Sequence, residues 1–394
     1  MNSFLDKQLD SQPKKVVFCK RCVVSNQRPR TEIDEEGVCG ACRWSDRKKN
    51  EIDWAAREKE LAALCDKHRS KDGKFDVVVP GSGGKDSGHT AHLLKAKYGM
   101  HPLCVTWAPF IYTDIGWKNF QNFVKSGFTT INCFPNGALH RKLAKVAFEL
   151  KGDAWEPFTY GQKAFAFNIA VKFGIPLIFY GENGEVEYGG SLKNAGKPYE
   201  SPDDWDELYF KGAGIDALLK QGLETGVFSE EEIKDPALEF YRPPKREDIE
   251  KLGAQMHWIS YYRNWIPQEN FYYAQKHTGF TANEEGRSEG TYSKYASLDD
   301  KTDGFHFYLG YIKFGLGRAT RDAMMEVRSG HITREEAVAL VKRYDGEFPK
   351  KYFKEFLEYL DITEEHFWEI IDFYRQPHLW EKVNGEWKLK YQVS

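Results

Sequence analysis

The central part of the chain alternates short apolar runs with longer amphipathic stretches. Apolar runs lie at 77–79, 101–107, 129–134 and 177–180, and a further run lies at 256–260. Helical spacing follows each of the first three runs, at 89–97, 117–125 and 138–150, and a further helical stretch at 161–173 precedes the fourth. Continuous apolar strands that alternate with helices predict an α/β fold with a doubly wound parallel sheet. Ligands of such sheets bind at the carboxyl ends of the strands.

The pattern changes on both sides of this alternation. Periodicity weakens over 189–255, where one clear helix start is expected at the capping box Ser229-x-x-Glu232. A long insertion after a strand at the active site often forms a lid or a substrate wall. The remainder after Asp303 has helical spacing, including the stretch 305–328 and a second capping box at Thr333-x-x-Glu336.

These shifts divide the chain into four expected parts. Residues 1–50 would form a small metal knuckle and 51–72 a connecting helix. Residues 73–303 would form the α/β domain with its insertion at 189–255, and residues 304–394 a C-terminal helical region.

Four cysteines near the start have the spacing of a metal site. They form two C-x2-C pairs separated by sixteen residues: Cys19, Cys22, Cys39 and Cys42. Such pairs can close a tetrahedral thiolate site, and a unit this small needs a metal because it has little core. Structural zinc is the favoured interpretation, with two disulfides or an iron–sulfur cluster as the alternatives.

The first strand runs directly into a glycine-rich loop and a helix start. Glycines let consecutive backbone N–H groups point into one concavity, which suits phosphate oxygens, and Lys85 adds a positive charge. The carboxylate of Asp86 beside a polyphosphate argues for Mg²⁺ between them. The expected ATP-binding residues here are Gly81, Ser82, Gly83, Gly84, Lys85, Asp86 and Ser87. The alternative is a glycine-rich turn that binds nothing.

Spacing excludes two other glycine loops. Val79 stands where a Walker A loop needs its first glycine, and Asp86 stands where the dinucleotide fingerprint needs its third. The sequence SGGKDS at 82–87 resembles the loop of the PP-loop ATP pyrophosphatases, whose fold is that of the adenine nucleotide alpha hydrolases. That resemblance implies cleavage of ATP between the α and β phosphates, with Lys85, Asp86, Ser82 and Ser87 as catalytic residues. It also implies adenine binding near Thr106 and Trp107, although a core role explains Trp107 equally well.

Further polar residues are candidates for substrate or magnesium. Carboxylates after the strand 177–180 should reach the same rim as the glycine loop and could share Mg²⁺ with Asp86. Basic residues of the C-terminal helices could face the pyrophosphate. The candidates are Glu182, Asn183, Glu187, Tyr188, Asp300, Lys301, Lys313, Arg318 and Arg321. An acidic surface loop or a solvated helix face is the competing interpretation for each.

Composition limits the partners and the location. The net charge is −3, from 56 basic and 59 acidic residues without basic blocks, so no nucleic-acid partner is expected. No run of 18 apolar residues occurs and the first 15 residues are polar, so we expect a cytoplasmic protein that does not enter membranes. The 15% aromatic content fits sugar-stacking surfaces or a thick aromatic core.

Taken together, these motifs resemble the N-acetyl sugar amidotransferases of bacterial surface-polysaccharide and flagellin-glycan biosynthesis. The resemblance rests on the four cysteines, the SGGKDS loop, and the segments 181–184, 187–190 and 298–301. It implies ATP-dependent conversion of the N-acetyl group of a nucleotide-activated sugar to an acetamidino group, with AMP and pyrophosphate released. It also implies that a separate glutaminase, similar to that of histidine biosynthesis and possibly accompanied by a cyclase-like subunit, supplies the ammonia.

The sequence also indicates that this chain does not itself release ammonia from glutamine. Position 2 is asparagine, and none of Cys65, Cys104 and Cys133 lies in a glycine-flanked elbow. Two rival functions remain open at this stage. One is a PP-loop tRNA thiolase, which should carry reactive cysteines and a basic face. The other is an interaction module on an inactive nucleotide fold.

Overall fold

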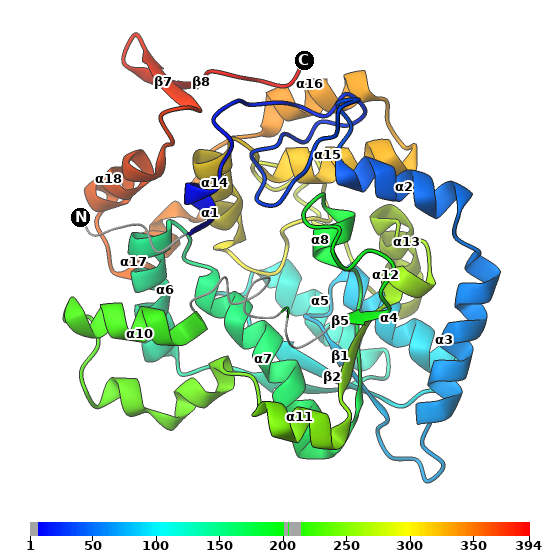
Figure 1. Cartoon of the computed structure of the whole chain (residues 1–394). Helices are drawn as coiled ribbons and strands as arrows, with labels where there is room; N and C mark the ends of the chain where they lie inside the picture. The colour runs from blue at the N-terminus through cyan, green and yellow to red at the C-terminus, as the bar shows by residue number, and fades with distance from the viewer. Residues whose placement is uncertain (1–6, 201–203, 205–213) are drawn as a thin grey trace.

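The computed structural model describes residues 7–200, 204 and 214–394, and is built around a six-stranded sheet (Figure 1). The strand order is β3-β2-β1-β4-β6-β5. The strands are β1 Val77–Pro80, β2 Pro102–Trp107, β3 Thr129–Cys133, β4 Leu177–Tyr180, β5 Tyr199–Glu200 and β6 Gln255–Trp258. All adjacent pairs are parallel except β5 with β6. The expected parallel α/β sheet is therefore confirmed, with one short antiparallel edge strand that the sequence pattern did not predict.

Alternate residues of each strand face opposite sides of the sheet, and both sides are covered. Val78 and Ile178 pack in one core with α6 (Gly137–Lys151) and α7 (Glu156–Phe173). Val77 and Val79 pack in another core with α3 (Trp54–His68) and α4 (Lys85–Ala96). This burial on both faces explains why the strands are apolar throughout rather than alternating.

The segment 189–255 differs from its expectation. It contains α10 (Gly214–Glu224), α11 (Arg246–Leu252) and the 3₁₀ helices η2 (Glu232–Lys234) and η3 (Pro236–Tyr241). Ser229 and Glu232 form the reciprocal hydrogen bonds of a capping box, but the element that begins at Glu232 is only the single 3₁₀ turn η2. Apolar side chains of α10, η3 and α11 pack against the side of the sheet covered by α6 and α7.

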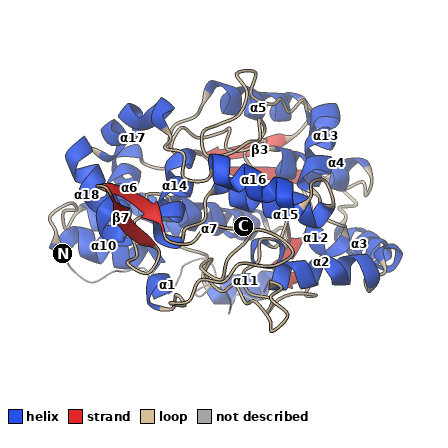
Figure 2. Ribbon diagram, turned by 90° about the horizontal axis from the view of Figure 1, so that it is seen from above, coloured by secondary structure: helices blue, strands red, loops and turns tan. Residues whose placement is uncertain are grey.

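Several shorter helices complete the sheet region. They are α5 (Asp114–Lys125), α8 (Gly184–Glu187), α12 (Ile259–Tyr262) and α13 (Pro267–Thr278). Helix α13 packs closely on α4, the helix that follows the glycine loop. Seen from above, helices lie around the strands of the six-stranded sheet (Figure 2).

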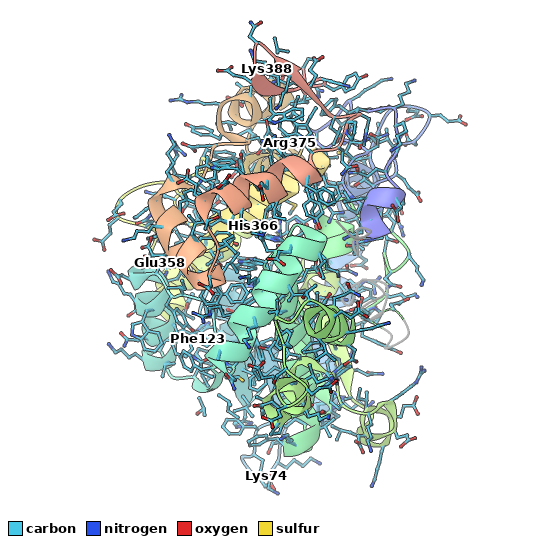
Figure 3. All side chains as sticks on the ribbon, turned by 90° about the vertical axis from the view of Figure 1, so that its left-hand side faces the viewer. Lys74, Phe123, Glu358, His366, Arg375 and Lys388 are labelled. Carbon is cyan, nitrogen blue, oxygen red and sulfur yellow. The ribbon has the colours of Figure 1, made fainter. Side chains whose placement is uncertain are left out.

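The C-terminal region is helical up to Tyr374 and then forms a hairpin. Its elements are α14 (Asp303–Phe314), α15 (Arg318–Ser329), α16 (Arg334–Tyr344), η4 (Lys350–Tyr352), α17 (Phe353–Leu360), α18 (Glu364–Tyr374), β7 (Trp380–Val383) and β8 (Glu386–Leu389). The stretch 305–328 is not one helix, because Gly315 adopts a left-handed conformation with φ of 68° and ends α14. Lys388 of the hairpin and Lys74, which precedes β1, lie at opposite ends of the molecule (Figure 3).

The N-terminal part lies beside these C-terminal helices. It holds α1 (Lys7–Asp10) and α2 (Gly40–Asn50), and the four cysteines pack in one apolar cluster with Met324 of α15 and Val341 of α16. Among the described residues, no helix combines the length and the apolar character needed to cross a membrane.

Candidate functional site

The glycine loop joins the carboxyl end of β1 to the start of α4, and close packing restricts its residues. Gly83 has φ of 82°, and a Cβ there would lie 2.8 Å from the backbone of Phe120 in α5. A Cβ on Gly81 would lie 2.0 Å from the Cβ of Ser87. The hydroxyl of Thr106 donates a hydrogen bond of 2.6 Å to the carbonyl of Gly81. Thr106 therefore supports the loop rather than lining its open side. These contacts favour glycine at both positions.

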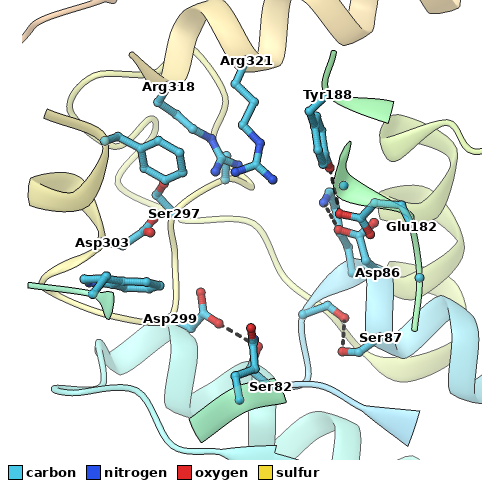
Figure 4. A pocket seen from close by; sticks show the side chains of 18 of the residues that line it. Ser82, Asp86, Ser87, Glu182, Tyr188, Ser297, Asp299, Asp303, Arg318 and Arg321 are labelled. Carbon is cyan, nitrogen blue, oxygen red and sulfur yellow. Dashed lines mark hydrogen bonds and ion pairs between the residues drawn. The ribbon is translucent and has the colours of Figure 1, made fainter. Parts of the chain in front are cut away.

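The loop opens into a pocket of about 690 Å³. Its walls come from the ends of β1, β2 and β4, from the loop before α14, from α15 and from the N-terminal part. The expected site residues that line it are Gly81, Ser82, Gly84, Lys85, Asp86, Ser87, Trp107, Glu182, Tyr188, Arg318 and Arg321. The structure thus brings together the glycine loop, the strand-end acid and two C-terminal arginines that are far apart in the sequence (Figure 4).

Two carboxylates lie close together at the edge of the pocket, Asp86 in the first turn of α4 and Glu182 after the end of β4 (Figure 4). Asp86 pairs with the ammonium of Lys85 and accepts a hydrogen bond from Asn270 at 3.0 Å. Glu182 accepts a hydrogen bond from the hydroxyl of Tyr188 at 3.0 Å. Burial raises the pKa of Glu182, and the negative charge of Asp86 raises it further. A divalent cation would relieve this repulsion, so the pair fits Mg²⁺.

Other expected site residues lie outside the pocket. Asn183 caps α8 by accepting bonds from the backbone of Glu185 and Val186. Lys301 pairs with Glu355 at 3.5 Å, and the buried ammonium of Lys313 donates to the carbonyl of Lys151 at 2.9 Å. None of these three residues lines the pocket, and the contacts of their side chains support the fold.

We expected Asp300 at the pocket, but the adjacent Asp299 lies there instead. The Asp299 carboxylate lines the pocket and accepts a hydrogen bond from Ser82 at 2.7 Å. Asp300 is buried behind it, where it accepts bonds from the backbone N–H groups of Phe110 and Thr302. Burial raises the pKa of Asp300 to about 7. Adjacent residues in an extended loop point in different directions, so the sequence alone could not decide between the two acids.

Glu187 also lies away from the pocket. Its carboxylate accepts hydrogen bonds from Trp44 at 3.1 Å and from Lys48 at 2.7 Å, both on α2. The Lys48 and Glu187 side chains are 10% and 3% exposed. Glu187 therefore joins α8 to the N-terminal part as a buried ion pair.

We expect Glu187→Ala to lower the free energy of unfolding by about 3 kcal/mol, because it leaves the Lys48 ammonium buried without its partner. Urea unfolding followed by tryptophan fluorescence would measure the change. Glu51→Ala is the control, since Glu51 forms an exposed pair with Arg47 and its loss should cost less than about 1 kcal/mol. Equal losses in the two variants would contradict the structural role of Glu187.

The four cysteine sulfurs meet at one point in the N-terminal part. All four are buried, and their sulfurs lie within 4.8 Å of one another. The distances from Cys19 to Cys42 and from Cys22 to Cys39 are 3.9 and 3.7 Å, which exclude disulfide bonds in this arrangement. Ligands about 2.3 Å from a tetrahedral ion lie about 3.8 Å apart. The donor set and spacing therefore fit a structural zinc ion with no open coordination position.

The sequence interpretation missed the part that this knuckle plays in the pocket. Val24, Arg28 and Pro29 follow the second cysteine and line the cavity. Arg30 holds the segment in place through two hydrogen bonds to Glu185, at 2.9 and 2.8 Å. No local motif marks Arg28, because it reaches the pocket only through the packing of the knuckle on α8 and α15.

An aromatic wall was also missed, apart from Trp107. The indole N–H of Trp107 has no hydrogen-bond partner among the described residues. Helix α7 can approach the Trp107 ring because residue 161 is glycine. Lys163 of α7 lies over the rings of Tyr180 and Trp258, at 4.0 and 5.2 Å from their centroids. Burial lowers the pKa of Lys163 to about 8 despite the nearby Glu200 and Glu182.

The expected wall from 189–255 is not found among the described residues. None of those between 189 and 255 lines the pocket. Residues 201–203 and 205–213 of this segment lie outside the described residues.

Comparison with known proteins relates the C-terminal part of the chain to a described family. A search among curated proteins found no similar sequence. Residues 289–393 match the model of the family described as LPS biosynthesis protein WbpG-like, C-terminal domain. The matched region includes Asp299, Arg318 and Arg321, three of the residues that line the pocket. The match therefore connects one wall of the candidate site with lipopolysaccharide biosynthesis and supports an enzyme of sugar biosynthesis.

Proposed function

We propose that this protein is an ATP-dependent amidotransferase of the PP-loop type, which converts the N-acetyl group of a nucleotide-activated sugar to an acetamidino group. The observation that carries the proposal is the shared pocket. The SGGKDS loop and the Asp86–Glu182 pair line one side of the cavity. Residues of the matched WbpG-like region line another side. The loop suits ATP, and the matched region suggests a surface-sugar substrate.

The reaction needs ATP because an acetamide is a poor electrophile. In the proposed first step the amide oxygen attacks the α phosphorus of ATP, the bond from this phosphorus to the bridging oxygen breaks, and pyrophosphate leaves. Lys85 and the backbone N–H groups of the loop would stabilise the departing pyrophosphate. Mg²⁺ held by Asp86 and Glu182 would offset charge on the phosphates.

The second step forms the new C–N bond. Ammonia attacks the imidate carbon, the carbon–oxygen bond to AMP breaks, and loss of a proton leaves the amidine. The imidate would hydrolyse in bulk water, so a walled pocket protects it.

The cysteines outside the knuckle support an external source of ammonia. Burial raises the pKa of Cys65 to about 12 and that of Cys133 to about 11, and it also raises the pKa of the buried Cys104. A glutaminase or a thiolase needs a reactive thiolate, which these surroundings disfavour. We propose that a separate glutaminase supplies the ammonia and that the protein acts on a nucleotide sugar in the cytoplasm.

The decisive experiment mixes the protein with ATP, Mg²⁺, ammonium and a panel of nucleotide-linked N-acetyl sugars. We expect AMP release and a product lighter by the mass difference between O and NH. Glutamine should replace ammonium only when a glutaminase is added. Turnover with glutamine by the isolated chain, or AMP release that needs tRNA rather than a sugar, would contradict the proposal.

The carboxylate pair makes a separate prediction about magnesium. We expect Glu182→Gln to raise the Mg²⁺ concentration for half-maximal AMP release about tenfold, because one charged ligand is lost. Glu284→Gln is the control, since Glu284 is an exposed residue paired with Lys118. An unchanged magnesium requirement in the Glu182 variant would assign the cation to other groups.

A further inference from the structure

The pocket carries basic residues on the wall that faces the glycine loop. Arg318 and Arg321 extend from α15 into the cavity, while Ser82 and Ser87 lie on the other side of it (Figure 4). Arg28 lines the same cavity from the knuckle. The cavity therefore has positive groups on two walls, with Lys85 and the glycine loop on one and the arginines on the other.

Two of the neighbouring arginines are matched by acids. Arg30 forms its two hydrogen bonds to Glu185, and Arg318 pairs with Asp322 at 3.2 Å. Their charge is already balanced within the protein. These two residues position the wall but leave little unbalanced charge for a ligand.

Arg28 and Arg321 are different. Neither forms an ion pair with a carboxylate of the described residues. The Arg321 guanidinium stacks on Tyr188, 4.0 Å from the ring centroid, and stacking leaves the N–H edge of a guanidinium able to donate to an acceptor. The Arg28 guanidinium donates a long hydrogen bond of 3.4 Å to the carbonyl of Pro29.

The electrostatics agree with an anion at this wall. Burial lowers the pKa of Arg28 to about 10; Glu185 opposes the shift, and the charges of Arg321 and Arg30 add to it. Arg28 still carries its proton at neutral pH. A bound anion would offset the repulsion between its charge and the charges of the other arginines most directly. Guanidinium groups bind phosphate oxygens through two parallel N–H bonds, which suits a diphosphate.

We propose that Arg28 and Arg321 form a second anion subsite that binds the diphosphate of the sugar nucleotide. The proposal rests on the proposed function, which requires two phosphorylated substrates in one pocket. The glycine loop would bind ATP, and the two arginines would bind the sugar nucleotide. The acetamido group would then lie between the walls, where it can meet the α phosphate. The size of the cavity, about 690 Å³, is within the usual range for small-molecule sites.

Calorimetric titration of the zinc-loaded full chain would test the subsite without turnover. The probes are UDP, GDP and dTDP, and a non-hydrolysable ATP analogue with Mg²⁺. We expect Arg28→Gln and Arg321→Gln each to weaken binding of the preferred nucleoside diphosphate at least about tenfold, and to change binding of the ATP analogue less than about twofold. Arg28→Lys, which keeps the charge but loses the paired N–H groups, should give an intermediate loss.

The matched control is Arg47→Gln, an exposed arginine of the same N-terminal part that pairs with Glu51. It should leave both affinities unchanged. Melting temperature and zinc content would confirm that each variant is folded, and Arg321→Gln tests the subsite even if the Arg28 variants do not fold.

The outcomes separate this inference from the proposed function. Loss of ATP affinity alone in the arginine variants would assign both side chains to ATP and overturn the subsite, as would unchanged nucleoside diphosphate binding. Absence of nucleoside diphosphate binding by the unaltered protein would also overturn it. Failure of AMP release with every sugar, while both arginines still control nucleoside diphosphate binding, would leave the subsite standing and overturn the amidotransferase.

Discussion

Lys85→Ala is expected to reduce ATP-dependent AMP release at least about 100-fold and to leave the protein folded. The Lys85 ammonium lines the pocket at the first position of α4 and pairs with Asp86. In the proposed reaction it meets the charge that develops on the departing pyrophosphate. An interaction that strengthens as charge develops accelerates the chemical step, so kcat should fall more than the affinity for ATP.

Initial rates of AMP formation, measured by chromatography, would test this prediction. The control is Lys95→Ala on the same helix, since Lys95 is exposed and donates a hydrogen bond to the carbonyl of Gly127. It should keep nearly the full rate. A Lys85 variant that is folded and releases AMP at the normal rate would remove the loop from the chemistry, and with it the mechanism proposed above.

Cys22→Ser is expected to abolish zinc binding and to lower the free energy of unfolding by an amount on the order of 5 kcal/mol. The four sulfurs are the centre of a small apolar cluster that includes Met324 of α15. Without the ion, the three remaining thiols and the new hydroxyl would be left close together with no metal to hold them. The knuckle also carries Arg28 and Pro29 into the pocket, so AMP release should fall with stability.

Metal analysis and thermal unfolding would measure both effects. The purified protein should contain about one zinc ion per chain. Cys133→Ser is the matched control, because Cys133 is only partly buried and lies at the end of β3, outside the knuckle. It should keep the zinc. A Cys22 variant with normal zinc content and stability would exclude the four-cysteine site.

Sequence and structure agree most closely where function depends on neighbouring residues. The apolar run before Gly81 and the helical spacing after Ser87 predicted a strand, a loop and a helix, and the structure has β1 and α4 on either side of this loop. The cysteine spacing predicted a four-sulfur cluster, which the buried sulfurs confirm. Both motifs are short, so local geometry determines most of their shape.

Sequence and structure agree less well where the sequence pattern could not distinguish between neighbouring acidic residues. Among the acids after β4, Glu182 faces the pocket and Glu187 binds α2. In the loop before α14, Asp299 rather than Asp300 meets Ser82. Each choice depends on which way a side chain points in an irregular segment, and composition does not encode that direction.

By itself, the sequence determined the parallel α/β sheet, the glycine loop at the end of its first strand and the four-cysteine cluster. Only the tertiary structure decided what stands opposite that loop. Ser82 and Asp299 are 217 positions apart, and Arg28 and Arg321 come from opposite ends of the chain. Such contacts arise when separate elements bury their apolar faces against one another, as the knuckle does on α15. The sequence thus specifies the glycine loop locally, whereas the facing wall exists only after the chain has folded.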